Sequence, residues 1–154
     1  LELAGAPIPD GLDGVSFAPL LNGGSLKPRP LHWHFPHYTN QGGRPGGALR
    51  EGPWKYVEYY DGGEPELYNL ELDPRETMNL APGRAEQIRA FGQALEAWRR
   101  SVGAQDTTPN PAVQEDLYRK LYQDVDVSKF TAEPRSADST PVLREWRRLM
   151  DKKP

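Results

Sequence analysis

The sequence predicts an α+β fold in which a small four-stranded antiparallel sheet is packed by one long helix. Four short strand-like runs follow one another within residues 30–70, and their short connections favour antiparallel pairing. One amphipathic helix follows at residues 84–102, and a single apolar stripe can cover one face of such a sheet. The 15 glycines and 16 prolines among 154 residues leave a packed core of fewer than about 100 residues.

The composition excludes several classes of function. The net charge is −3 with acids and bases interspersed, which argues against a nucleic-acid-binding surface. No apolar run approaches the roughly 20 residues of a membrane span. The chain has no cysteine, so it holds no disulfide, thiolate metal site or cysteine nucleophile. Neither a Ser-His-Asp nucleophile elbow nor a pair of catalytic carboxylates is visible, and we expect no catalytic residue here.

The first strand, predicted over residues 30–35, contains the run LHWHF. Alternation places its leucine, tryptophan and phenylalanine on one face, and His32 and His34 on the other. Pro36 ends the strand because it cannot donate to a ladder. His37 then stands at the mouth of the following loop.

A glycine-rich loop is predicted over residues 39–47, which include the run QGGRPGG. It lacks the Lys-Ser/Thr of a phosphate-binding P-loop, so a flexible connection is the favoured interpretation. Arg44 is the exception to that interpretation, because a guanidinium on such a loop could grip a sulfate or carboxylate with two hydrogen bonds.

The remaining elements follow from turns and periodicity. Further strands are predicted at residues 48–50, 54–60 and 66–70. In the run DPRE, Asp73 and Glu76 carry the signature of a helix-capping box, sufficient for one turn. The long helix ends at a glycine, and it buries a stripe with 3, 4, 3, 4 spacing formed by Ile88, Phe91, Leu95, Trp98 and Val102. Arg99, beside this stripe, is expected to face solvent.

The three histidines leave three interpretations open. His32 and His34 share a face and could share a metal ion. The nearest carboxylates, Asp13 and Glu51, are however far away in sequence, and we expect no metal site. The histidines could instead form hydrogen bonds at the sheet end, or line the polar wall of a pocket.

Three runs, in order, resemble the C-terminal part of sulfatases of the arylsulfatase A type. They are LDGVSFAPLLNG, RPLHWHFPHYTNQGGRPGGALREGPWKYVEYY and ELYNLELDPRETMNLA. The most specific element is D-P-x-E-x-x-N-L at residues 73–80, followed by the WHFPHY–GGRPGG run. The resemblance covers residues 1–111 and weakens in the tail.

The resemblance implies a catalytic domain that precedes this chain. The family hydrolyses sulfate esters with a formylglycine, made from the first residue of a C/S-x-P-S-R motif, beside a calcium ion. That motif and the acidic calcium ligands are absent here, so no cofactor is expected in this chain itself. Residues 1–28 are then a lead-in from the N-terminal catalytic domain, residues 29–103 the C-terminal subdomain of an alkaline-phosphatase-like sulfatase, and residues 104–154 a loosely ordered tail with short helices at 115–122 and after Thr140. The family suggests a periplasmic or secreted protein.

The subdomain is expected to line the substrate cleft of the parent enzyme. The candidate substrate-binding residues are His34, His37 and Arg44, and the expected ligand is a sulfated small molecule or sulfated sugar. The alternative is a stand-alone, non-catalytic α+β binding or interaction module. A C-x-P-S-R motif upstream of Leu1 would decide for the sulfatase.

Overall fold

The computed structural model describes residues 1–39, 43–122, 124 and 139–150. The chain divides into two units, Leu1–Pro30 and Leu31–Pro154. The first unit is an irregular segment with a 3₁₀ turn, η1 (Glu2–Ala4), and one short helix, α1 (Ala18–Leu21). Ala18 is its one buried hydrophobic residue, so this unit has no core of its own.

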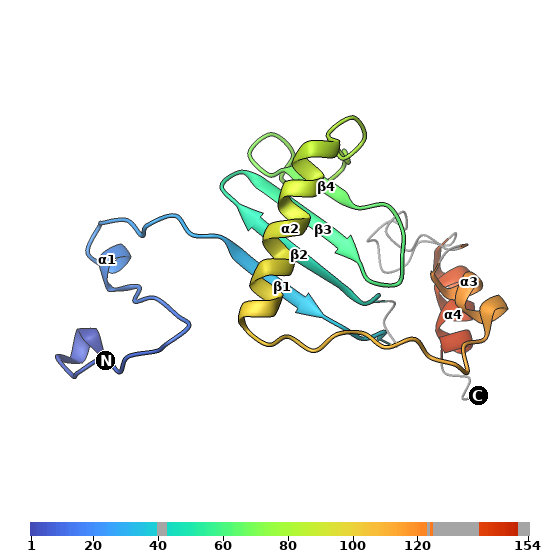
Figure 1. Ribbon diagram of the computed structural model, residues 1–154, viewed down its shortest axis with the longest axis horizontal. Coiled ribbons are helices and arrows are strands. Elements are labelled where there is room, and N and C mark those ends of the chain that lie inside the picture. The colour runs from blue at the N-terminus through green and yellow to red at the C-terminus, as the bar shows by residue number, and fades with distance from the viewer. Residues whose placement is uncertain (40–42, 123, 125–138, 151–154) are drawn as a thin grey trace. The chain divides into compact units, whose positions relative to one another are not determined.

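The second unit is built on a four-stranded sheet with the order β1-β2-β3-β4, every neighbouring pair antiparallel (Figure 1). Its strands are β1 (Leu31–Phe35), β2 (Gly46–Glu51), β3 (Trp54–Tyr59) and β4 (Glu66–Asn69). The predicted meander is confirmed. The predicted glycine-rich loop is shorter than expected, because its last two glycines belong to β2, and its residues 40–42 lie outside the described part.

Close packing explains why two glycines open β2. A Cβ at Gly47 would stand 2.3 Å from the hydroxyl oxygen of Tyr60, and a Cβ at Gly46 would stand 2.6 Å from the carbonyl oxygen of Glu58. Real Cβ atoms do not come this close, so only glycine fits without displacement. These glycines therefore allow Tyr60 and Glu58 to pack closely against β2, whereas the sequence suggested that they belong to a flexible connection.

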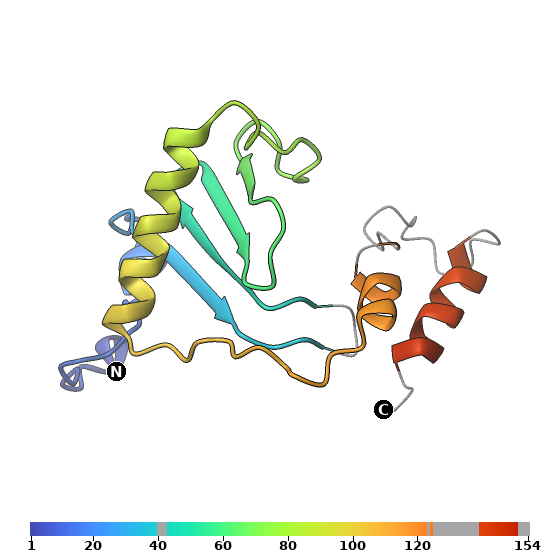
Figure 2. The same cartoon turned by 45° about the vertical axis from the view of Figure 1, so that its right-hand side comes forward.

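Helix α2 (Ala85–Ser101) covers one face of the sheet (Figure 2). The core between them consists of Leu49, Tyr56, Leu67, Phe91 and Leu95, flanked by Trp54, Ala81, Ile88 and Trp98. The predicted stripe is thus the buried one, with Val102 exposed just beyond the helix. The expectation for Arg99 is wrong: its side chain is 16% exposed, and its guanidinium lies 4.4 Å from the centre of the Tyr60 ring.

The D-P-x-E-x-x-N-L run forms a hydrogen-bonded turn after β4. The carboxylate of Asp73 accepts from the backbone N–H of Met78 at 2.8 Å. Glu76 does not reach back to complete a capping box, because it pairs with Lys55 on β3 at 2.6 Å. Asn79 accepts from the backbone N–H groups of Leu67 and Ala81. The polar residues of the motif therefore either stabilise the turn internally or connect it to the sheet.

The tail contains α3 (Glu115–Tyr122) and α4 (Ser139–Met150), at the positions predicted. The indole N–H of Trp146 donates to the carbonyl of Leu121 at 2.9 Å, which joins the two helices. The part of the loosely ordered tail predicted between these two helices falls mostly outside the described residues. In the part of the chain that is described, no helix has the length and apolar character needed to cross a membrane.

Candidate functional site

The three predicted site residues lie around the end of the sheet where β1 finishes and β2 begins. His34 is the fourth residue of β1 and pairs with Gly47 of β2. His37 follows β1 directly, and Arg44 stands two residues before β2. Antiparallel pairing therefore brings together residues from both sides of the loop, but each has a different environment.

His34 is held at both ring nitrogens. Its Nδ1 lies 2.8 Å from the Tyr60 hydroxyl, and its Nε2 lies 2.7 Å from the carbonyl oxygen of Gln105. Since a carbonyl only accepts, Nε2 carries a proton and donates. His34 thereby fixes the segment after α2 to the sheet.

The other two histidines have separate surroundings. His32 stacks on Trp98 of α2, with ring centroids 4.6 Å apart. Burial lowers the pKa of His32, and the nearby negative charge of Glu51 raises it by a smaller amount. His37 is exposed and makes an edge contact with Phe35 at 5.6 Å between ring centroids. Among the described residues, no group of three or more His, Asp or Glu side chains could hold a metal ion.

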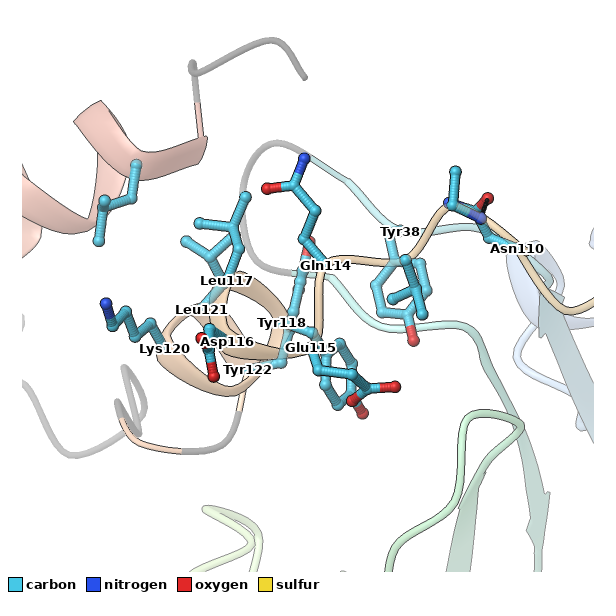
Figure 3. A pocket seen from close by; sticks show the side chains of 13 residues that line it. Tyr38, Asn110, Gln114, Glu115, Asp116, Leu117, Tyr118, Lys120, Leu121 and Tyr122 are labelled. Carbon is cyan, nitrogen blue, oxygen red and sulfur yellow. Dashed lines mark hydrogen bonds between the residues drawn. The ribbon is translucent and has the colours of Figure 1, made fainter.

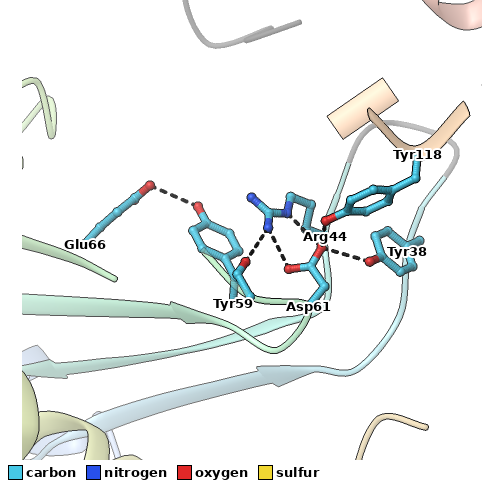
Figure 4. A network of polar contacts seen from close by, with 7 residues as sticks. Tyr38, Arg44, Tyr59, Asp61, Glu66 and Tyr118 are labelled. Atoms are coloured by element: carbon cyan, nitrogen blue, oxygen red, sulfur yellow. Dashed lines mark hydrogen bonds and ion pairs between the residues drawn. The ribbon is translucent and has the colours of Figure 1, made fainter. Parts of the chain in front are cut away.

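Arg44 is paired with a carboxylate that the sequence did not single out. Its Nε and Nη2 donate to the two carboxylate oxygens of Asp61 at 2.9 and 2.7 Å (Figure 4). Nη2 also donates to the carbonyl of Gly62 at 2.6 Å, and the guanidinium lies 4.5 Å from the centre of the Tyr59 ring. The side chains of Arg44 and Asp61 are 22% and 9% exposed, so this cation is already neutralised within the chain.

Two tyrosine hydroxyls complete the coordination of Asp61. Tyr38 donates at 2.8 Å and Tyr118 at 3.1 Å, both to Oδ2. Burial by itself would raise the pKa of Asp61, but the hydrogen bonds from Arg44 and Tyr38 outweigh it and lower this pKa. We call Tyr38, Arg44, Asp61 and Tyr118 the Asp61 cluster. It joins three segments that are far apart in sequence: the loop after β1, the turn after β3, and α3.

A cleft of about 840 Å³ lies beside the cluster, between Tyr38, α3 and Leu149 of α4 (Figure 3). Its aromatic part is formed by Tyr38, Tyr118 and Tyr122, whose ring centroids lie 4.8 to 6.1 Å apart. Its polar groups come from Asn110, Gln114, Glu115, Asp116 and Lys120. Such a wall can position a ligand.

The register of the hairpin could have revealed Asp61 from sequence. Gly46 pairs with Tyr59 across β2 and β3. Continuing this register by two residues on each strand sets Arg44 opposite Asp61, and opposite charges at facing positions attract. Tyr118 could not be found this way, because it comes from a helix 57 residues further along.

One protein-family model matches most of this chain. The model of the N-sulphoglucosamine sulphohydrolase C-terminal domain matches residues 1–100, which include the whole sheet and nearly all of α2. The chain belongs to this family. It is thus a sulfatase C-terminal region, and the fold class and family expected from its motifs are confirmed.

Relatives and solved structures agree with this assignment. Arylsulfatase K of Danio rerio is 38% identical over 125 residues, 77% of this chain and 22% of that protein. Delta 4,5-hexuronate-2-O-sulfatase of Bacteroides thetaiotaomicron is 35% identical over 86 residues, 52% of this chain and 17% of that protein. A solved structure of a protein in complex with its substrate, D-glucosamine-2-N,6-O-disulfate, has a TM-score of 0.51 and 25% identity, covering 68% of this chain and 23% of that one.

The chain spans about a fifth of the length of the curated relatives it matches, 18% to 22% for arylsulfatase K of three species. The matched region is therefore a small part of each relative.

Proposed function

We propose that this chain is the C-terminal portion of a sulfuric ester hydrolase and completes the wall of its substrate cleft. The family match over residues 1–100 carries the proposal. The alternative of a stand-alone binding module is less favoured, because the matched relatives are about five times longer than the matched region.

The formylglycine and calcium expected for such an enzyme do not fit the residues of this chain. The sequence has no cysteine and no C/S-x-P-S-R motif, and the described residues contain no acidic cluster suited to a cation. We therefore derive no catalytic step here and assign both groups to a preceding domain. In this proposal residues 1–28 lead out of that domain, residues 29–103 form the subdomain, and residues 104–154 form a tail.

We assign different roles to the three candidate residues. His37 contacts the substrate, because its exposed imidazole can donate to a sulfate or a sugar hydroxyl. His34 and Arg44 are positioning residues, since Tyr60 and Gln105 contact both ring nitrogens of His34 and Asp61 pairs with Arg44. This differs from the sequence-based expectation that Arg44 grips the ligand directly.

The proposed substrate is a sulfated sugar. Support comes from two relatives: a hexuronate-2-O-sulfatase and a protein solved with D-glucosamine-2-N,6-O-disulfate. In both cases the sulfate is carried by a sugar, and a cleft with aromatic and amide groups suits a sugar ring.

Steady-state kinetics of the full-length protein tests this proposal. Wild type should hydrolyse a sulfated disaccharide and a small aryl sulfate. His37→Ala should lower kcat/KM for the disaccharide about tenfold, the worth of one hydrogen bond to a charged group, and change the aryl sulfate value less than about twofold.

Arg100→Ala is the matched control, because Arg100 lies on the exposed side of α2, and it should change neither value. Equal losses on both substrates would mean that His37 does not contact the sugar. If wild type hydrolyses no sulfate ester, the proposed function is wrong.

A further inference from the structure

The cleft beside the Asp61 cluster is built almost entirely by the tail, and we call it the tail cleft. Of the described residues that line it, only Tyr38 lies within residues 1–100, the part that the family model matches. The others come from residues 110–122 and from Leu149 of α4 (Figure 3). A ligand bound in the tail cleft would therefore be recognised mainly by side chains that the family model does not cover.

Tyr38 is fixed by its neighbours and yet remains open to solvent. Its hydroxyl donates to Asp61 at 2.8 Å, and its ring centroid lies 6.1 Å from that of Tyr118 and 4.8 Å from that of Tyr122. Tyr38 is nevertheless 45% exposed. An aromatic ring that is already held in place can bind the apolar C–H face of a sugar with little further loss of side-chain freedom.

Two amide side chains supply hydrogen-bonding groups in the tail cleft. Asn110 and Gln114 both line it, and both are exposed. A carboxamide carries two donors and an acceptor, so these residues can exchange hydrogen bonds with sugar hydroxyls. Apolar and aromatic surface with a few polar groups that fix orientation is the usual composition of a small-molecule site.

The charges of the tail cleft disfavour a sulfate. Its described lining includes the carboxylates of Glu115 and Asp116 but one ammonium group, that of Lys120. The neighbouring carboxylate of Asp61 is neutralised by Arg44. Bringing like charges together costs free energy, so the lining accepts an uncharged sugar ring more readily than a sulfated one.

We propose that the tail cleft binds an uncharged sugar unit of the substrate, distinct from the unit that carries the sulfate to be cleaved. This inference rests on the proposed function. His37, which contacts the substrate in that proposal, directly precedes Tyr38 in the chain, so one oligosaccharide can reach both residues. The tail then makes the enzyme selective for oligosaccharides over single sulfated sugars.

Binding of the uncharged tetramer of N-acetylglucosamine to the full-length protein tests this subsite. In isothermal titration calorimetry, wild type should bind the tetramer with a Kd of about 1 mM or tighter. Tyr38→Leu should raise this Kd at least about fivefold, because it removes the aromatic ring. Tyr38→Phe is the matched control: it also loses the hydrogen bond to Asp61 but keeps the ring, and should change the Kd less than about twofold.

Asp116→Lys tests the charge selectivity at an exposed position, where a substitution should not affect folding. It should tighten binding of the same tetramer carrying one sulfate per unit at least about threefold, and change the Kd of the uncharged tetramer less than about twofold. An unchanged Kd for the sulfated tetramer would overturn the proposed selection of an uncharged unit. This variant also keeps the test decisive if Tyr38→Leu does not fold.

Absence of tetramer binding by wild type, or equal Kd values for Tyr38→Leu and Tyr38→Phe, would overturn the proposal. Hydrolysis of a sulfated disaccharide without tetramer binding rejects the subsite alone. Tetramer binding that depends on the ring of Tyr38, without hydrolysis of any sulfate ester, rejects the proposed function alone.

Discussion

At the scale of single residues, Arg44 and Asp61 hold the end of the sheet together. The pair is bidentate and mostly shielded from water, and two tyrosine hydroxyls also donate to Oδ2 of the carboxylate. A carboxylate with this number of donors is strongly held. The loop before β2 and the turn after β3 are therefore fixed relative to each other.

Removing Arg44 should destabilise the full-length protein. Arg44→Ala leaves Asp61 largely buried without its cation, at a cost of about 2–3 kcal/mol in the free energy of unfolding. Arg100→Ala breaks an exposed pair with Glu96 and should cost about 0.5 kcal/mol or less. Urea denaturation measures both. A loss for Arg44→Ala no larger than that of the control would mean that water solvates the pair.

His32 should make stability depend on pH. Burial lowers its pKa in the folded state, so the unfolded chain binds more protons. Its contribution is then fully present above the unfolded pKa of about 6.5 and is lost as pH falls through the folded value. Between pH 7.5 and pH 5, wild type should lose more unfolding free energy than His32→Phe. Identical pH profiles of the two proteins would show that His32 titrates as in water.

At the scale of elements, α2 is the only described helix with a buried stripe against the sheet. The side chain of Leu95 is completely buried between α2 and the sheet. The ring of Phe91 stacks on that of Tyr56, with ring centroids 6.1 Å apart. Trp98 is half-buried because it lies at the edge of the core, where its ring stacks on His32. The centre of the helix should therefore contribute more to stability than its last turn.

This ranking can be measured by substitutions along α2. Leu95→Ala should cost about 2–5 kcal/mol, the range for emptying a fully buried leucine site. Trp98→Ala should cost less than Leu95→Ala, because part of its ring already contacts water. Arg100→Ala is again the exposed control, and Arg99 is unsuitable because it packs on Tyr60. A larger loss of unfolding free energy for Trp98→Ala than for Leu95→Ala would mean that the centre of the hydrophobic core lies nearer to β1.

At the scale of the whole molecule, the proposed function has this chain supply shape and a preceding domain supply the chemistry. Under this proposal the cleft wall is a surface that the preceding domain completes. The sequence has no C/S-x-P-S-R motif, and the described residues contain no group suited to a metal ion, whereas the proposed sulfate ester cleavage uses both a nucleophile and a cation.

Residues 1–154 produced alone should therefore hydrolyse no aryl sulfate, with or without added calcium. The full-length protein should hydrolyse it under the same conditions. The control for folding is the far-ultraviolet circular dichroism of the isolated chain, which should show the sheet and α2. Turnover by a folded isolated chain would mean that a catalytic group lies within these residues.

The sequence by itself determined the order and type of the elements and the family. Alternation, turn residues and the 3, 4, 3, 4 stripe are local signals, and they predicted four strands and α2 to within two residues at every boundary. The D-P-x-E-x-x-N-L motif resembles the sulfatase pattern, and its residues form one compact turn, in which local sequence and structure agree.

Only the tertiary structure decided what each polar residue does. The hairpin register sets Asp61 opposite Arg44, but only the structure shows that Tyr118 of α3 joins this pair. Gly46 and Gly47 looked flexible until Tyr60 and Glu58 packed against them. These outcomes depend on contacts between segments distant in the chain. A side chain's charge and exposure are set by its neighbours in space, which local sequence patterns do not encode.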